Sequence, residues 1–205
     1  MGRPSAREEL LDCAERLFAD RGLHGISLRS INAEAGLSSA ALHYHFGSKK
    51  ALVESLLERQ MPSLMHRRRE LLDALEARET TPTTREILGA LLEPQVELLA
   101  EGGEAGHRYI RLIHRLQSDG DLDFRFVLER WPGGVERLVP LLKEANPSLL
   151  QASIERRLAF AIDVMLPSLV KAPKPLGNNL ELYISELLGF LTGAFEAPET
   201  TELYE

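Results

Sequence analysis

The chain has 205 residues, of which 44% are hydrophobic and 27% are charged, a balance typical of a globular protein and not of a disordered one. Its single cysteine, Cys13, excludes an intrachain disulfide, and no apolar run is long enough to cross a membrane, so we expect a cytoplasmic protein without a membrane partner. The formal net charge is −7, yet residues 1–50 hold seven basic and six acidic side chains, so the excess acidity lies in the remainder.

The first predicted helix opens at the capping-box pattern that runs from Ser5 to Glu8, and it ends before Gly22. One side of it is apolar and carries Leu10, Ala14, Leu17 and Phe18. Cys13 lies beside this stripe, so we expect it to be a small buried hydrophobe and not a redox sensor. We interpret this helix as a scaffold.

A second helix is predicted to begin at Ser27, whose side-chain oxygen can accept a hydrogen bond from a free amide one turn later. Its apolar residues Leu28, Ile31 and Ala35 recur at helical spacing. Gly36 ends it, because glycine tolerates the left-handed conformation that closes a helix. Ser38 then offers a new N-cap, so a third helix over residues 39–46 follows almost at once. Two helices joined by so short a turn form a helix-turn-helix.

The third predicted helix turns Leu42 and Phe46 inward. Its outer face carries Ser39, Ala40, His43, Tyr44 and His45. In a DNA-binding helix-turn-helix, the second helix enters the major groove, where its outward side chains reach base edges. The alternative is an ordinary exposed helix of a bundle, because each of these residues taken singly is common on a protein surface.

Residues 42–52, LHYHFGSKKAL, resemble the recognition-helix signature of the tetracycline-repressor (TetR) family of bacterial regulators. The resemblance extends upstream to Ala14 and covers about the first quarter of the chain by motif. It implies an all-α fold of about nine helices, with a DNA-binding domain over residues 1–50 and a ligand-binding and dimerisation domain over residues 51–205. One position departs from the family, which commonly has alanine where this chain has Asn32. We expect that buried amide to find a local hydrogen-bond partner.

The resemblance also implies a function: a ligand-responsive repressor that binds a palindromic double-stranded DNA operator as a homodimer. It places phosphate contacts at Ser27, Tyr44, His45 and Lys49. It places base readout at Arg29, Ser39, Ala40 and His43. Two alternatives stay open, namely a helical small-molecule-binding or enzymatic protein with a vestigial helix-turn-helix, and a DNA-binding regulator with no small-molecule effector.

Catalytic motifs are missing from the sequence, which has no Gly-rich phosphate loop, no nucleophile elbow and no His-Glu-x-x-His. His43 and His45 cannot share one metal ion, because residues two apart on a helix point about 200° away from each other. We therefore expect no enzymatic activity, no metal and no cofactor.

Ser48 is predicted to cap a fourth helix that runs from Lys49 to about Ala77, with a bend at Pro62. A helix of that length would be a rod connecting the two domains. We expect the arginine triplet at residues 67–69 to be a solvated face that pairs with neighbouring glutamates.

Helical patterns fill the rest of the chain, over residues 85–101, 104–117 and 122–143, with breaks at Gly102-Gly103 and at residues 132–134. Two long helices follow, from Ser148 to Val170 and from Asn178 to Phe195. Both have apolar stripes wider than one partner face can cover, which predicts a homodimer through these two helices. Gly189 and Gly193 on the last helix would allow another helix to approach closely.

Aromatic and aliphatic side chains on these helices usually form core. In the TetR family, however, the helices after the connecting rod enclose an effector cavity, which suits a small hydrophobic or amphipathic molecule. We predict that its apolar lining includes Leu88, Leu92, Tyr109, Ile113, Phe124, Val127, Trp131 and Phe160. His114 and Asp163 are the predicted polar contacts for the ligand.

Overall fold

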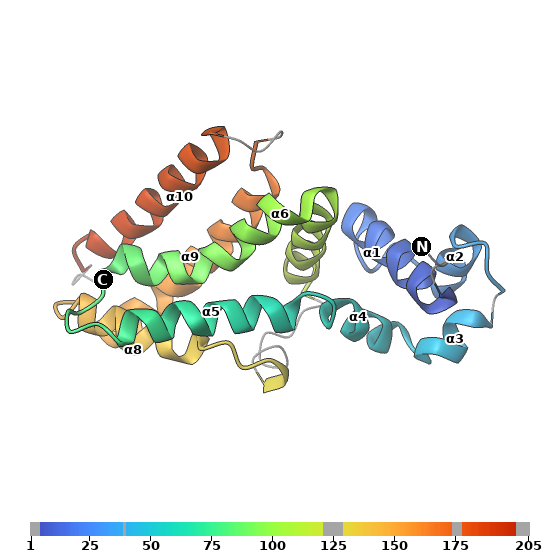
Figure 1. Cartoon of the computed structure of the whole chain (residues 1–205), viewed down its shortest axis with the longest axis horizontal. Helices are drawn as coiled ribbons and strands as arrows, with labels where there is room; N and C mark the ends of the chain where they lie inside the picture. The colour runs from blue at the N-terminus through green and yellow to red at the C-terminus, as the bar shows by residue number, and fades with distance from the viewer. Residues whose placement is uncertain (1–4, 39, 121–128, 174–177, 200–205) are drawn as a thin grey trace, which may run out of the picture.

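The computed structural model describes residues 5–38, 40–120, 129–173 and 178–199, and within these ranges it is built of helices without a strand (Figure 1). The helices are α1 (Ala6–Arg21), α2 (Leu28–Glu34), α3 (Ala41–Phe46), α4 (Lys49–Leu57), α5 (Met61–Glu76), α6 (Thr84–Ser118), α8 (Val135–Ala145), α9 (Gln151–Val170) and α10 (Asn178–Glu196). The predicted all-α fold with about nine helices is confirmed. A search of the described helices finds none with the length and apolar character needed to span a bilayer.

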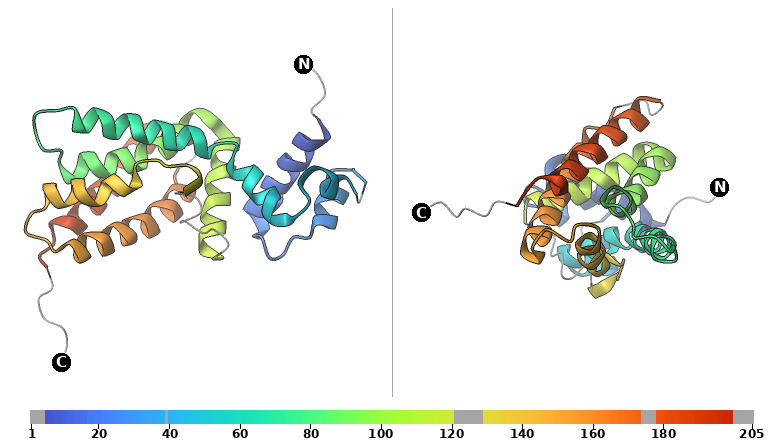
Figure 2. Two further views of the ribbon diagram at one scale, coloured as in Figure 1. Left: turned by 90° about the horizontal axis from the view of Figure 1, so that it is seen from below. Right: turned by 90° about the vertical axis from the view of Figure 1, so that its left-hand side faces the viewer.

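The molecule is elongated, with α1, α2 and α3 at one end and α5, α6, α8, α9 and α10 at the other (Figures 1 and 2). The caps predicted for the first two helices are present: Ser5 Oγ accepts from Glu8 N, and Ser27 Oγ accepts from Ser30 N. The cap predicted at Ser38 is wrong. The N-cap residue of α3 is Ala40, and the N-cap makes no side-chain hydrogen bond to the helix.

The connecting rod is two helices and not one. α4 ends at Leu57 and α5 starts at Met61, so Pro62 lies in the first turn of a new helix, where a missing N–H costs nothing. At the break, the carbonyl oxygen of Leu57 accepts a hydrogen bond from Gln60 N at 3.3 Å and another from the buried hydroxyl of Tyr109 on α6 at 3.0 Å. Residues 58–60 therefore form a joint that is anchored to α6.

Helix α6 is sharply kinked at Gly103, whose φ of 52° and ψ of −135° are not helical. The kink confirms the predicted break between the segments 85–101 and 104–117. A Cβ at Gly106 would lie 2.1 Å from the carbonyl oxygen of Leu98, so only glycine allows this close backbone approach. The first half of α6 runs along α5, and the second half turns toward α1 (Figure 1).

Helix α1 meets the later part of the chain near both of its ends. Arg59, in the joint, donates to Glu8 at 2.7 Å and to Asp12 at 2.7 Å, and both acceptors belong to α1. At the other end of α1, a Cβ on Gly22 would lie 2.8 Å from Asp119 Oδ2, just after α6. Helix α1 is therefore in contact with both the joint and the end of α6.

Candidate functional site

Helix α3 presents its outer face to solvent. The Tyr44 side chain is 86% exposed, and its ring lies edge-on to that of His45 with centroids 5.1 Å apart. His43 Nδ1 bonds the carbonyl oxygen of Gly47 at 3.0 Å. Since a carbonyl only accepts, Nδ1 carries the proton and Nε2 is left for another partner. Ala40 is exposed at the start of the helix, whereas Ser39 lies outside the described residues.

Buried contacts fix the orientation of α3. Leu42 and Phe46 face the core formed with α1, as predicted. Asn32, which is 2% exposed on α2, accepts a hydrogen bond from Leu42 N through Oδ1 at 3.2 Å. The local partner expected for this amide is therefore confirmed. Asn32 satisfies one of the free N–H groups of the first turn of α3, a task that Ala40 cannot perform.

The cationic side chains around α3 differ in how many of their hydrogen-bond donors are already used within the chain. Lys49 Nζ donates to the carbonyl oxygens of Leu23 and Ile26 at 2.5 and 2.6 Å, so two of its three N–H groups are used to order the loop before α2. Lys50 is 84% exposed and lies 3.9 Å from Glu54. Arg29 is exposed and has no ion-pair partner among the described residues. Ser27, another predicted phosphate contact, already exchanges hydrogen bonds with Ser30 through its Oγ.

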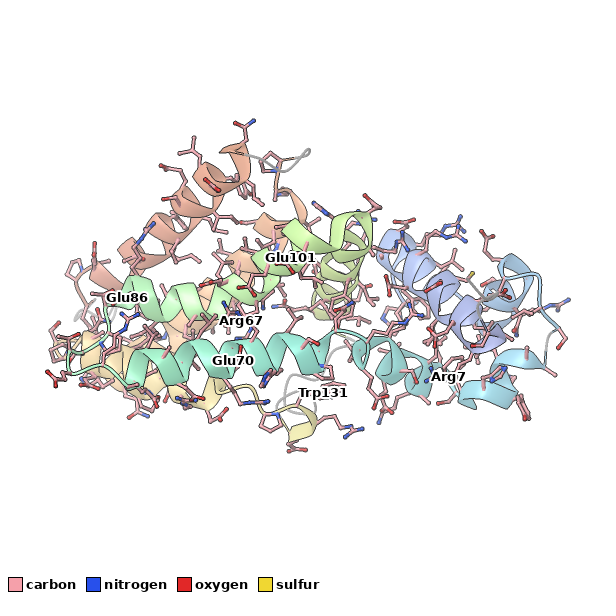
Figure 3. All side chains as sticks on the ribbon, viewed as in Figure 1. Arg7, Arg67, Glu70, Glu86, Glu101 and Trp131 are labelled. Carbon is pink, nitrogen blue, oxygen red and sulfur yellow. The ribbon has the colours of Figure 1, made fainter. Side chains whose placement is uncertain are left out.

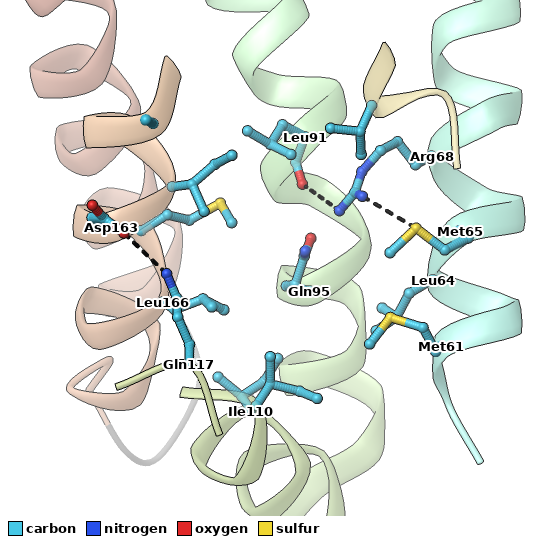
Figure 4. A pocket seen from close by; sticks show the side chains of 15 residues that line it. Met61, Leu64, Met65, Arg68, Leu91, Gln95, Ile110, Gln117, Asp163 and Leu166 are labelled. Carbon is cyan, nitrogen blue, oxygen red and sulfur yellow. Dashed lines mark hydrogen bonds between the residues drawn. The ribbon is translucent and has the colours of Figure 1, made fainter. Parts of the chain in front are cut away.

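A second candidate site is a cavity of about 320 Å³ between α5, α6 and α9 (Figure 4). Its walls are largely apolar. The side chains that line it include Met61, Met65 and Arg68 from α5, Gln95 and Ile113 from α6, and Ile162 and Asp163 from α9. Its size is at the lower end of the range of small-molecule sites.

Of the predicted lining residues, Ile113 and Asp163 line this cavity. Leu88 and Leu92 are fully buried in the packing of α6 and do not reach it. Tyr109 lies one turn before Ile113 on the same wide apolar face of α6. Its hydroxyl donates to the Leu57 carbonyl oxygen, and its side chain does not line the cavity. These three residues, predicted to contact the ligand, therefore do not line this cavity.

The remaining predicted residues are also elsewhere. His114 bonds Ser118 one turn along α6, and burial lowers its pKa below the usual value. Trp131 is buried beneath the Arg130 guanidinium, 5.7 Å from the ring centre, and Phe160 is 60% exposed on the outside of α9. None of these three lines the cavity. Phe124 and Val127 lie outside the described residues.

Arg68 is the charged residue among the lining side chains that the sequence did not predict. The sequence predicts a solvated triplet, and Arg67 does pair with Glu97 at 2.8 Å. It also lies 3.5 Å from Glu70, one turn along the same helix (Figure 3). Arg68, in contrast, is 3% exposed, and burial lowers its pKa to about 10. The signal was its spacing, since Leu64 and Leu72 lie four residues before and after it on the apolar stripe of α5.

Metal binding finds no support in the described residues, which contain no cluster of three His, Cys, Asp or Glu side chains able to hold an ion.

The outer faces of α9 and α10 carry large apolar side chains that are exposed. These are Phe160, Leu182 and Phe190. Gly193 is exposed on the same helix as the last two, and no atom lies within 4 Å of where its Cβ would be.

Family models match both ends of the chain. A model described as bacterial regulatory proteins, tetR family, matches residues 10–56. A second, described as a tetracyclin repressor-like C-terminal domain, matches residues 89–194, about half of the chain. The first match contains the whole helix-turn-helix, and the second contains most of the cavity residues on α6 and α9.

Individual relatives are similar over part of the chain. The HTH-type transcriptional repressor KstR2 of Rhodococcus jostii (strain RHA1) is 39% identical over 80 residues, 38% of this chain and 39% of that protein. The HTH-type transcriptional regulator BetI of Rhizobium meliloti is 36% identical over 89 residues, 43% of this chain and 41% of that protein. The chain therefore matches about two fifths of the length of these curated relatives.

Solved structures resemble the chain over nearly its whole length. The ketosteroid transcriptional regulator KstR2 of Mycobacterium tuberculosis superposes with a TM-score of 0.62 at 25% identity, covering 94% of this chain and 95% of that chain. A probable transcriptional regulatory protein, RHA5900, superposes with a TM-score of 0.64 at 23% identity, covering 91% and 97%.

Proposed function

Since the chain belongs to the tetR family of bacterial regulatory proteins, we propose that it is a transcriptional repressor that binds a palindromic DNA operator as a homodimer and releases it when a small amphipathic molecule occupies the cavity. The observation that carries this proposal is the outer face of α3. It is exposed, rich in hydrogen-bonding side chains and rigidly held by Asn32, Leu42 and Phe46. Repressors of this kind act in the cytoplasm, where the operator is.

On the DNA, we assign base readout to Arg29, Ser39, Ala40 and His43. We assign phosphate contacts to Ser27, Tyr44, His45 and Lys49. Phosphate contacts set affinity, and base contacts set sequence preference. Because Lys49 and Ser27 spend most of their donors within the chain, exposed Lys50 joins them as a phosphate-facing charge.

Dimerisation through α9 and α10 would cover Phe160, Leu182 and Phe190, which otherwise remain in water. Gly193 would let the partner helix approach closely, because the space beside it is open. An arrangement of this kind is isologous, with the same face used by both copies, so it presents two α3 helices related by a two-fold axis. Two such helices match half-sites whose centres lie about 34–36 Å apart, or a multiple of that distance.

The switch would act through the joint at residues 58–60. Met61 lines the cavity, and it stands directly after that joint. Ile110, which also lines the cavity, directly follows Tyr109, whose hydroxyl holds the Leu57 carbonyl. A ligand that alters the spacing of α5 and α6 would therefore shift α4 and the contacts of α1. It works only if it binds the DNA-incompetent arrangement more tightly than the competent one.

An electrophoretic shift assay with fragments of bacterial genomic DNA, followed by footprinting, tests this proposal. We expect a few fragments to be bound at nanomolar concentration and two protected half-sites related by a two-fold axis. Equal, weak binding to every fragment would instead favour a helical binding protein or enzyme with a vestigial helix-turn-helix. Specific binding that no small molecule relieves would favour a regulator without an effector.

A further inference from the structure

The cavity contains one buried charge, and that charge lacks an opposite one. Arg68 Nη2 donates to the carbonyl oxygen of Leu91 at 3.3 Å, and Nη1 contacts Met65 Sδ at 3.3 Å. With its amide oxygen turned toward Arg68, Gln95 accepts from Nη2 at 2.8 Å. Arg68 Nε has no partner within the described residues. Every group that the guanidinium touches there is neutral (Figure 4).

Nearby carboxylates are engaged elsewhere. Glu93 and Glu97 of α6 pair with Arg67, at 3.5 and 2.8 Å, on the surface of the molecule. Asp163 lies across the cavity on α9 and accepts from Gln117 Nε2 at 3.0 Å (Figure 4). A cation removed from water without a counter-ion costs several kcal/mol. An arginine so placed is therefore a strong site for an anion that enters the cavity, since its fork of N–H groups fits a carboxylate.

We propose that the cavity binds a monocarboxylate with an apolar body, whose carboxylate pairs with Arg68 and whose body lies against the methionine and leucine side chains of α5 and α9. This inference rests on the proposed function of the cavity as the effector site and names the chemistry of that effector. The apolar body follows from the walls, and the anionic head follows from Arg68.

The opposite end of the cavity sets the orientation of the ligand and limits its charge. Asp163 and Gln117 both line that end, and Gln117 Oε1 is a buried acceptor with no partner among the described residues. Two acceptors there would repel a second carboxylate. We therefore expect a ligand with a single carboxylate. At the packing density of protein interiors, roughly 0.75, about 240 Å³ of ligand fits within the cavity, which suits a body of roughly ten carbon atoms.

Isothermal titration calorimetry on the intact protein without DNA tests this inference, with decanoate, uncharged decanol and the dicarboxylate sebacate as probes. We expect decanoate to bind roughly tenfold or more tightly than decanol, and sebacate to bind more weakly than decanoate. Equal affinity for decanoate and decanol would overturn the inference. An affinity for sebacate equal to that for decanoate would also overturn it, because the acceptors at the far end would then not exclude a second carboxylate.

Two arginine variants localise the effect. Arg68→Met should abolish the preference for decanoate over decanol, whereas Arg67→Met, which removes the same charge one residue away on the surface, should leave it unchanged. The Met variant is expected to fold, because apolar replacement of a buried charge is often neutral or stabilising. If it does not, the decanoate and decanol affinities of the natural chain decide the question. Unchanged decanoate preference in folded Arg68→Met would refute the assignment to Arg68.

This test is separate from that of the repressor proposal. If specific DNA binding is found and no carboxylate preference is seen, the chemistry of the effector is wrong and the repressor stands. If decanoate binds through Arg68 and no specific DNA is found, the anion site stands and the repressor proposal fails.

Discussion

Replacing Asn32 by alanine, the residue common in the family at this position, should loosen α3 in this chain. The change removes the acceptor of Leu42 N–H and leaves a buried donor unsatisfied, which costs about 1–3 kcal/mol. The higher helix propensity of alanine offsets about 0.5 kcal/mol of this cost. The net loss of about 0.5–2.5 kcal/mol should lower the melting temperature by about 1–10 °C for a chain of this size.

Urea unfolding at one fixed protein concentration measures this loss, and hydrogen exchange of the Leu42 amide locates it. Asn179→Ala, an exposed position in the first turn of α10, is the matched control and should change little. Operator affinity should fall in Asn32→Ala as well, because α3 has six residues and is too short to hold its own shape. A change in unfolding free energy below about 0.5 kcal/mol, within the scatter of surface substitutions, would refute this account of how α3 is positioned.

Four further substitutions and one chemical treatment test the DNA contacts, the dimer, the core and the switch. Lys50→Ala should lower the slope of log affinity against log salt by roughly 0.9, whereas Lys49→Ala should in addition lower the free energy of unfolding by about 1–3 kcal/mol; a salt slope of Lys50→Ala equal to that of the natural chain would contradict the first part. Gly193→Glu should give a light-scattering mass of one chain and much weaker operator binding, and a natural chain that is itself monomeric at micromolar concentration would rule out the dimer. Burial raises the pKa of the Cys13 thiol, so at pH 8 it should react with a disulfide reagent far more slowly in the native protein than in urea; comparable rates would contradict its burial. Tyr109→Phe should weaken the effect of a bound ligand on operator affinity while leaving both separate affinities nearly unchanged, and undiminished coupling would show that the switch bypasses the joint.

The helix-turn-helix could be predicted closely because its signals are local. Ser27, Gly36 and the apolar pair Leu42 and Phe46 each act within one or two turns of the chain. The resemblance of residues 42–52 to the TetR family is confirmed by the family models. The cap at Ser38 failed because Asn32, ten residues before Leu42, supplies the bond from another helix.

The joint and the cavity depended on contacts distant in sequence, and these could not be predicted in the same way. The apolar stripe continues from α4 into α5, so Pro62 was read as a bend, although it fits equally well in the first turn of a new helix. Tyr109 and Ile113 share one wide apolar face. Which of them borders a void depends on how α5 and α9 pack against α6. The charge of Arg68 groups it with Arg67 and Arg69 in the sequence, whereas its spacing places it on the apolar stripe of α5.

Selection from a random DNA pool, carried out with the natural chain and with His43→Ala, tests most directly whether α3 reads DNA. The account predicts that the natural chain enriches a palindrome and that His43→Ala blurs the preference at one position, symmetrically in both half-sites. Failure to enrich any sequence, or an identical profile for both proteins, would contradict it.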